Sequence, residues 1–298
     1  MRFLDADAVA ALGPAAAVEA IRQALLRGFD PAADPARVSV DITNGQFLLM
    51  PSQSSTAAGV KVVTVAPGNP ARGLPRIQAA YLLFDPDTLA LRAVLDGAAL
   101  TTLRTPAVSV AAVLRRLPHR PLRVAVIGAG PQATGHISTL AAVRTLQEAN
   151  YLVRDPSRAP VKASALGSPE ADEVLRRADL VVCATSARTP VFDSALVADD
   201  AVVVAVGSHE PVARELDASL LKRATVVVED VATALREAGD VVLAIADGAL
   251  TPDELVPMAD FVTAAADVPA DLPLVFKSVG MSWQDLVVAE AVLKRREA

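Results

Sequence analysis

The feature that most constrains the fold is a glycine-rich segment that directly follows a short apolar run. Residues 124–127 are Val-Ala-Val-Ile, and Gly128-Ala-Gly-Pro-Gln-Ala133 comes next. This is the G-x-G-x-x-A pattern of a strand, a tight turn and a helix start in a dinucleotide-binding βαβ unit. Gly128 permits the sharp turn, and Gly130 lets a pyrophosphate approach the N–H groups at the helix start. A glycine-rich turn alone is weakly specific, but the strand before it and the helix after it favour a nucleotide site.

Length, composition and charge exclude several classes of protein. A chain of 298 residues suits two domains, and 52% hydrophobic with 21% charged residues indicates a folded protein. The net charge of -6 offers no basic surface for nucleic acid or for membranes. No apolar stretch reaches the roughly 18 residues of a membrane span. Asp5 and Asp7 interrupt the region where a signal peptide needs an apolar run, and the single cysteine, Cys183, allows no intramolecular disulfide, so a reducing cytoplasm is expected.

The N-terminal part of the chain is predicted to form a mainly antiparallel sheet with one helix. Residues 15–28 have the apolar spacing of an amphipathic helix, and Asn44-Gly45 is typical of a hairpin turn between two extended pieces in residues 37–50. Further strands are expected at 59–65, 77–84 and 91–95.

The rest of the chain predicts a different architecture. Thr105 and Pro106 have the residue types of an N-cap and first helical position, so a helix is expected to begin there and to run to about residue 117. Strands then alternate with helices, which predicts a parallel sheet covered on both faces. These strands are expected at 124–127, 151–153, 180–184, 202–206 and 226–228.

The expected fold class is therefore α/β. A Rossmann-type, doubly wound parallel-sheet domain is predicted over residues 119–280. A discontinuous α+β domain is predicted from residues 1–118 and 281–298, because the tail helix at 283–296 carries an apolar stripe that can pack back on the first domain.

Short motifs along almost the whole chain have a specific order. They are Arg37, Met50-Pro51, Gly59-Val-Lys61, Asn69, Gly73-Leu-Pro75, Asp96-Gly97, residues 100–105, 127–133, 178–185 and 206–208, Pro211, Arg214-Glu-Leu-Asp217 and Phe276-Lys-Ser-Val-Gly280. In this order they resemble the ornithine cyclodeaminase and μ-crystallin family. The resemblance implies a homodimer whose N-terminal domains pair, with a nicotinamide cofactor in the second domain. Members of that family include cyclising deaminases, amino-acid dehydrogenases, cyclic-imine reductases and NADPH-binding crystallins.

Three cations are candidates for holding a substrate carboxylate. Arg104 can grip a carboxylate with two parallel hydrogen bonds, although an arginine in this position could also be merely solvated. The resemblance favours the substrate role for Arg104 and matches Arg37 to a second arginine on the same carboxylate. Lys61 lies in a β-branched strand, where a lysine is often a device against edge aggregation. The resemblance instead implies that Lys61 faces the substrate, where desolvation would bring its pKa towards a useful range for proton transfer.

Two positions depart from the family pattern. His209 stands where the cyclodeaminases carry an aspartate that is thought to act as a base. An imidazolium can donate a proton near neutrality, which suits reduction of a C=N bond, although His209 could equally be a surface histidine without a role. The adjacent Glu210 could take over the carboxylate's part, which keeps deamination open. Arg76 could narrow the substrate pocket, add a carboxylate contact or point to solvent.

The coenzyme is expected to contact residues from several loops. Arg154, Ser157 and Arg158 follow the second Rossmann strand. They favour NADP(H), because arginines accommodate a 2′-phosphate, and NAD(H) is the alternative coenzyme. The chain after Arg158 is shorter than the family pattern, and the usual helix there is expected to be reduced or missing. The remaining expected cofactor-binding residues are Thr105, Gly128, Gly130, Pro131, Gln132, Thr185, Val206, Lys277 and Gly280.

The resulting hypothesis is a homodimeric NAD(P)H-dependent reductase of a small cyclic imino acid, Δ1-pyrroline-2-carboxylate or Δ1-piperideine-2-carboxylate, to proline or pipecolate. Lys61, Arg104 and His209 are its expected catalytic residues, and Arg37 and Arg76 its expected substrate contacts. An NAD-recycling ornithine cyclodeaminase, a non-enzymatic NADPH-binding protein and an amino-acid dehydrogenase are the alternatives. The three histidines and one cysteine are well separated, so no metal site is predicted, and His119 and His136 are expected to be structural.

Overall fold

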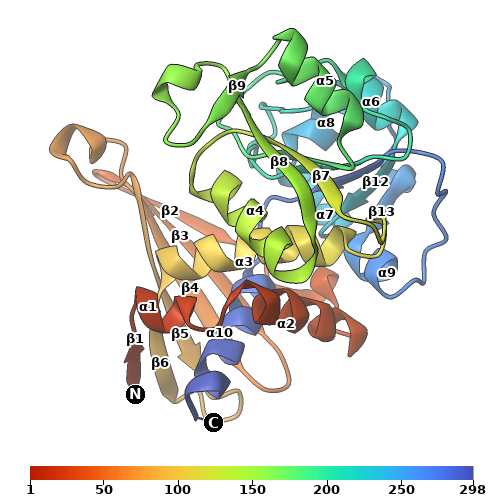
Figure 1. Ribbon diagram of the computed structural model, residues 1–298. Helices are drawn as coiled ribbons and strands as arrows, with labels where there is room; N and C mark the ends of the chain where they lie inside the picture. Colours follow the sequence, from red (N-terminus) through yellow and green to blue (C-terminus); the bar gives the residue numbers. More distant parts are fainter. Residues whose placement is uncertain (298) are drawn as a thin grey trace. The chain divides into compact units, whose positions relative to one another are not determined.

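The computed structural model describes residues 1–297 and divides into two compact units (Figure 1). Unit 1 comprises Met1–Val108 together with the tail from Met281, and unit 2 comprises Ser109–Gly280. The discontinuous first unit and the α/β character of the second agree with the fold class predicted from the sequence. The first division lies between residues 108 and 109, whereas the sequence analysis placed it after residue 118.

Unit 1 is built on one six-stranded sheet in the order β1-β6-β5-β4-β3-β2. Strand β1 pairs parallel with β6, and every other neighbouring pair is antiparallel. The predicted β2–β3 hairpin is present, but its turn residues are Thr43 and Asn44, one residue earlier than predicted, because Gly45 begins β3 and pairs with Ile42. The strands are β1 (Arg2–Leu4), β2 (Val38–Ile42), β3 (Gly45–Gln53), β4 (Ala58–Val65), β5 (Ile77–Phe84) and β6 (Leu91–Asp96).

One face of this sheet is covered by the tail helix. Helix α10 (Ser282–Glu297) packs on β3, β4 and β5 and on helix α2 (Pro14–Leu26), while the short helix α1 (Ala6–Ala10) packs near β6 (Figure 1). The prediction that the tail returns to the N-terminal domain is therefore confirmed. Beneath α10, Lys61 pairs across the strands with Met50 on one side and Tyr81 on the other, and all three are buried.

Helix α3 (Gly97–Val113) corrects a prediction. Thr105 and Pro106 do not start a helix, because the helix begins eight residues earlier and Pro106 lies inside it. The Asp96 carboxylate caps this start by accepting a hydrogen bond from Ala99 N at 2.8 Å. A proline inside a helix removes one backbone hydrogen bond at a cost of about 3 kcal/mol. The following turns bury Ala107, Val108, Val110 and Ala111 almost completely, and this burial offsets that cost.

Unit 2 contains an eight-stranded, fully parallel sheet in the order β13-β12-β14-β11-β10-β7-β8-β9. Continuous runs of valine and alanine form its central strands, as expected for strands buried on both faces. The strands are β7 (Leu122–Ile127), β8 (Leu146–Val153), β9 (Ala163–Ala165), β10 (Leu180–Cys183), β11 (Val202–Ala205), β12 (Thr225–Val228), β13 (Leu255–Pro257) and β14 (Leu274–Lys277).

Helices lie on both sides of this sheet (Figure 1). They are α4 (Pro131–Val143), α5 (Pro169–Arg177), α6 (Ala218–Arg223), α7 (Val231–Glu237), α8 (Gly239–Ala246) and α9 (Met258–Val262). No α-helix joins β8 to β9, and a single 3₁₀ turn at Pro156–Arg158 replaces it, so the expected loss of the helix after this strand is confirmed. None of the helices described over residues 1–297 has the length and apolar character needed to span a bilayer.

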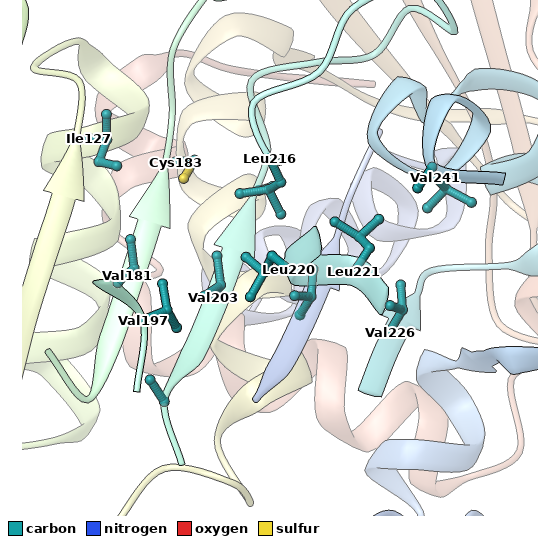
Figure 2. Close-up of a cluster of buried hydrophobic side chains, with 14 of the residues drawn as sticks. Ile127, Val181, Cys183, Val197, Val203, Leu216, Leu220, Leu221, Val226 and Val241 are labelled. Atoms are coloured by element: carbon teal, nitrogen blue, oxygen red, sulfur yellow. The ribbon is translucent and has the colours of Figure 1, made fainter. Parts of the chain in front are cut away.

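The core of unit 2 is continuous across the sheet. Figure 2 shows Ile127, Val181, Cys183 and Val203 from three adjacent strands in one cluster with Leu216, Leu220, Leu221 and Val241 and with Val226 of β12. These side chains bury one face of the central strands. The chain runs outward from β7 to β8 and β9 and then crosses back to β10, so β7 and β10 flank the point where the strand order reverses. Ligands of such sheets bind at the carboxyl ends of the strands at this point.

We expect Gly128→Ala and Gly130→Ala to affect stability differently. Gly128 has φ +112°, and a Cβ there would lie 2.5 Å from the Ala184 carbonyl oxygen, whereas a Cβ on Gly130 would meet no atom within 4 Å. Gly128→Ala should therefore lower the free energy of unfolding by about 2–3 kcal/mol, and Gly130→Ala by less than about 1 kcal/mol. Urea unfolding followed by circular dichroism measures both, and equal losses would contradict the description of this turn.

Candidate functional site

In unit 1, a buried lysine and a buried arginine meet at one carboxylate. The Lys61 ammonium lies 3.1 Å and 3.3 Å from the two carboxylate oxygens of Asp285. Arg104, on α3, places Nε 3.4 Å from Asp285 Oδ1 and donates from Nη1 to Gln284 Oε1 at 3.0 Å. Lys61 and Arg104 are 3% and 6% exposed, and Asp285 is fully buried. The first turn of α10 therefore holds both cations in place.

A third cation acts on the same cluster. The positive charge of Arg37, which is half-buried, contributes to lowering the pKa of Lys61. The carboxylate of Asp34 interacts electrostatically with that of Asp285, so this cluster of Arg37, Lys61 and Arg104 with Asp285 and Asp34 contains more cations than carboxylates. Such an excess in a desolvated setting favours an anionic ligand, and a carboxylate matches the guanidinium geometry.

The pKa of Lys61 is lowered from 10.5 to about 8. Burial is the main cause, and the charges of Arg104 and Arg37 lower it further, while the Asp285 carboxylate raises it. An ammonium with this pKa can both pair with an anion and exchange a proton near neutral pH.

Several residues of this cluster escaped the sequence analysis. Asp285 and Gln284 lie on the tail helix, where two fully buried polar residues between Trp283 and Leu286 break the apolar pattern. That break was the only available signal in the sequence. Asp34 accepts a hydrogen bond from Trp283 N at 2.8 Å, and burial is the main cause that raises the pKa of its carboxyl to about 6.

The remaining unit 1 candidates lie in different settings. Arg76 is exposed in the connection that precedes β5. Thr105 is buried on α3, directly after Arg104.

In unit 2, the glycine-rich turn has the geometry of a phosphate cradle. Gly128 takes the positive φ of the sharp turn, and Gly130 is the N-cap of α4 with no side-chain cap. The N–H groups at the start of this 13-residue helix are therefore left for an anion, and the space beside Gly130 is open. Pro131 occupies the first helical position, and Gln132 follows it. These residues fit a dinucleotide pyrophosphate.

The loop after β8 contains the residues expected to select the coenzyme. Arg154, Ser157 and Arg158 are exposed. The Asp155 carboxylate accepts hydrogen bonds from Ser157 N at 3.1 Å and Ser157 Oγ at 2.6 Å. This carboxylate therefore caps the 3₁₀ turn and is engaged within the loop.

The carboxyl ends of β10, β11 and β14 carry the other expected coenzyme contacts. Thr185 follows β10, Val206 follows β11, and Lys277 ends β14. The Lys277 ammonium is fully buried, 2.9 Å from Asp240 Oδ2, and donates to the Ser208 carbonyl at 2.6 Å. Its charge is thus engaged within the protein.

The last expected coenzyme contact is Gly280, which follows β14. Its φ is +82°, and its N–H donates to Glu229 Oε2 at 2.9 Å.

The histidines occupy contrasting environments. His209 is exposed in the loop after β11, and the neighbouring Glu210 pairs with Arg188 at 2.9 Å. His136 is buried, donates from Nδ1 to the Gln132 carbonyl oxygen and shares a hydrogen bond between Nε2 and Ser109 Oγ, and burial lowers its pKa to about 4. Across residues 1–297 there is no cluster of three potential metal ligands.

Comparison with known proteins gives consistent matches along the chain. Residues 9–298 match the model of the ornithine cyclodeaminase/mu-crystallin family. A Delta(1)-pyrroline-2-carboxylate/Delta(1)-piperideine-2-carboxylate reductase of Azospirillum brasilense is 35% identical over 262 residues, which cover 85% of this chain and 81% of the relative.

Solved structures are similar over almost the whole length. The Delta(1)-pyrroline-2-carboxylate reductase of Thermococcus litoralis, in complex with NADH and L-proline, is 27% identical with a TM-score of 0.86, covering 100% of this chain and 98% of that one. An archaeal alanine dehydrogenase dimer with bound NAD is 26% identical with a TM-score of 0.83, covering 99% and 95%. The family match over nearly every residue, with the glycine turn and the buried cation cluster described above, shows that this chain belongs to the ornithine cyclodeaminase/mu-crystallin family.

Proposed function

We propose that the chain is an NAD(P)H-dependent reductase of small cyclic imino acids, converting Δ1-pyrroline-2-carboxylate or Δ1-piperideine-2-carboxylate to proline or pipecolate. The observation that carries this proposal is the cluster in which Lys61, Arg104 and Arg37 lie close to the carboxylates of Asp285 and Asp34. The cluster supplies the positive charge that a substrate carboxylate needs. The names of the relatives support the substrate class, since they describe reductases of these imino acids.

Each unit has a separate task in this proposal. In unit 1, Arg104, Arg37 and Lys61 hold the carboxylate of the imino acid, and Arg76 adds a further contact. In unit 2, the Gly128–Gly130 turn and the start of α4 hold the pyrophosphate. A bound reduced nicotinamide supplies the hydride, which adds to the carbon of the C=N bond. The nitrogen gains one proton, so that the imine becomes a secondary amine.

His209, or a water molecule that it orients, is the proposed proton donor. An exposed imidazole can be recharged directly from solvent, and it replaces the aspartate of the deaminating relatives with a group that can donate. The Lys61 ammonium is a second possible donor because of its pKa of about 8.

NADP(H) is the proposed coenzyme, with NAD(H) as a possible alternative. Arg154 and Arg158 place two exposed guanidinium groups in the loop after β8, and Asp155 is engaged in capping that loop. An acidic residue free to bind ribose hydroxyls would favour NAD(H) instead. The related structures named above hold NADH or NAD, so the support for NADP(H) comes only from the residues of this loop.

An ornithine cyclodeaminase, a non-catalytic NADPH-binding protein and an amino-acid dehydrogenase are less well supported. The deaminase would release ammonia from ornithine without net change in the coenzyme. The binding protein would turn over no imine, and the dehydrogenase would need free ammonia for reductive amination.

The test of the function is coenzyme oxidation with a panel of cyclic imino acids, run with NADPH and with NADH. We expect stoichiometric oxidation with both five- and six-membered rings and a lower KM for NADPH. Arg104→Ala should raise the KM for the imino acid by about tenfold to a hundredfold, because a charge-assisted hydrogen-bond pair is lost. Arg76→Ala should raise this KM by a smaller factor, because Arg76 is exposed and adds only a further contact. Unchanged kinetics in Arg104→Ala would show that Arg104 does not hold the substrate carboxylate.

The pH dependence of kcat/KM tests the charge of Lys61. Because Lys61 must be protonated to hold the carboxylate, activity should fall as the pH rises through about 8. Asp285→Asn removes the carboxylate that raises this pKa, so the fall should move to lower pH. His209→Ala should leave that fall in place and lower kcat, because the proposed proton donor is lost. Full activity in His209→Ala would contradict the role of His209.

We also propose that the chain forms a homodimer through unit 1. Val38, Val40 and Ile42 alternate along the edge strand β2, and each is about half exposed. They continue a face of the sheet opposite to α10, where Phe47 pairs with Val40 and is also exposed. An edge strand with an exposed apolar row favours association with another copy. The related alanine dehydrogenase is described as a dimer.

We expect Val40→Asp to convert the dimer to a monomer, because a charge would be buried in the apolar contact. Ser39→Asp, one residue away on the opposite face of β2, is the matched control and should remain dimeric. Light scattering coupled to size-exclusion chromatography measures both masses. A monomeric wild-type protein would contradict the proposal.

A further inference from the structure

One buried carboxylate joins two strand ends in unit 2. Glu215 lies between β11 and α6 and is fully buried. Its Oε1 accepts hydrogen bonds from Thr185 N at 2.8 Å and Thr185 Oγ at 2.7 Å, and its Oε2 accepts one from Gly207 N at 2.7 Å. Thr185 follows β10 and Gly207 follows β11, so a single side chain connects the carboxyl ends of two adjacent strands.

Glu215 is itself held by a second buried carboxylate. Asp240 Oδ1 accepts hydrogen bonds from Glu215 N at 2.7 Å and Leu216 N at 2.8 Å. Its other oxygen pairs with the Lys277 ammonium at 2.9 Å, and Lys277 also donates to the carbonyl of Ser208. The ends of β10, β11 and β14 are therefore joined by one buried network, in which Glu215 and Asp240 are the carboxylates and Lys277 is the cation.

The space between the ends of β10 and β11 is too small for an additional side-chain atom at Gly207. A Cβ on Gly207 would lie 2.0 Å from the Thr185 carbonyl oxygen and 2.5 Å from Glu215 Oε1. Only a residue without a side chain fits there, and the Glu215 carboxylate fills the remaining space. The backbone of the two loops is thus fixed by contacts beneath it.

We propose that Glu215 is a positioning residue for the nicotinamide end of the coenzyme, acting through Thr185 and Gly207. The proposal rests on the coenzyme-dependent function proposed above. In a doubly wound sheet the pyrophosphate lies at the first glycine turn, and the rest of the ligand extends over the neighbouring strand ends. The Gly128 turn follows β7, and the strand order reverses between β7 and β10. The ends of β10 and β11 therefore lie on the other side of that point, where they receive the nicotinamide ring.

The chemistry at these strand ends requires a carboxylate. Three donors converge on two oxygens that can only accept. A glutamine has the same shape, but its amide nitrogen would face either Gly207 N or the two donors of Thr185, and donor would oppose donor. Glu215→Gln therefore releases one strand end while the volume of the core is retained.

The experiment compares two ligands on Glu215→Gln and the wild type by calorimetry. NADPH carries the nicotinamide ring, and 2′-phospho-ADP-ribose lacks it; NADH and ADP-ribose form the equivalent pair. We expect the dissociation constant of NADPH to rise at least about tenfold, while that of 2′-phospho-ADP-ribose changes less than about twofold. Glu215→Asp, which keeps the charge but cannot reach both strand ends, should show the same difference.

Asp217→Asn is the matched control. Asp217 lies two residues away and caps α6 by accepting a hydrogen bond from Leu220 N at 2.9 Å. Its loss should lower the melting temperature and leave the ratio of the two dissociation constants unchanged. Equal weakening of both ligands in Glu215→Gln, or no weakening of either, would overturn the positioning role. Failure of the wild type to bind any of the four ligands would instead refute the proposed function.

Discussion

The buried pairing of Asp285 with Lys61 and Arg104 is the interaction on which unit 1 depends. Two cations packed beneath a helix repel each other and lose their hydration, so the Asp285 carboxylate between them lowers the cost of burying both. The pairing also sets the chemistry, because burial lowers the pKa of Lys61 to about 8 and Asp285 prevents a further fall. Structure and reactivity thus have the same physical origin in this cluster.

In unit 2, buried carboxylates orient the loops at the ends of the strands. Its central strands are apolar on both faces, so they supply cohesion but no polar groups to orient the loops at their ends. Glu215, Asp240 and Glu229 provide this orientation, each accepting backbone N–H groups from the loops at the carboxyl ends of the strands. Lys277 balances part of their charge. A rigid apolar layer below and a buried polar layer above give the coenzyme-binding end a defined geometry.

The sequence predicted those parts of the fold that depend on local pattern. The hairpin near Asn44, the parallel strands and the glycine turn all have short-range signals, and the structure contains them, with the hairpin turn one residue earlier than predicted. The helix start at Thr105–Pro106 was wrong, because the capping carboxylate of Asp96 and burial of the following turns outweigh the local preference of proline. The partners of Lys61 and Arg104 could not be predicted in this way. Asp285 lies 224 residues after Lys61, and no local pattern encodes a contact of that separation.

That separation has a consequence for biosynthesis. The strand that carries Lys61 is synthesised well before α10, because Asp285 follows Lys61 by 224 residues. Until residues 282–297 are released, the face of the sheet under α10 lacks both its apolar cover and its counter-charge. Unit 1 therefore completes its folding only after α10 has been synthesised, because a chain that stops before residue 282 contains the strands of unit 1 without their helical cover.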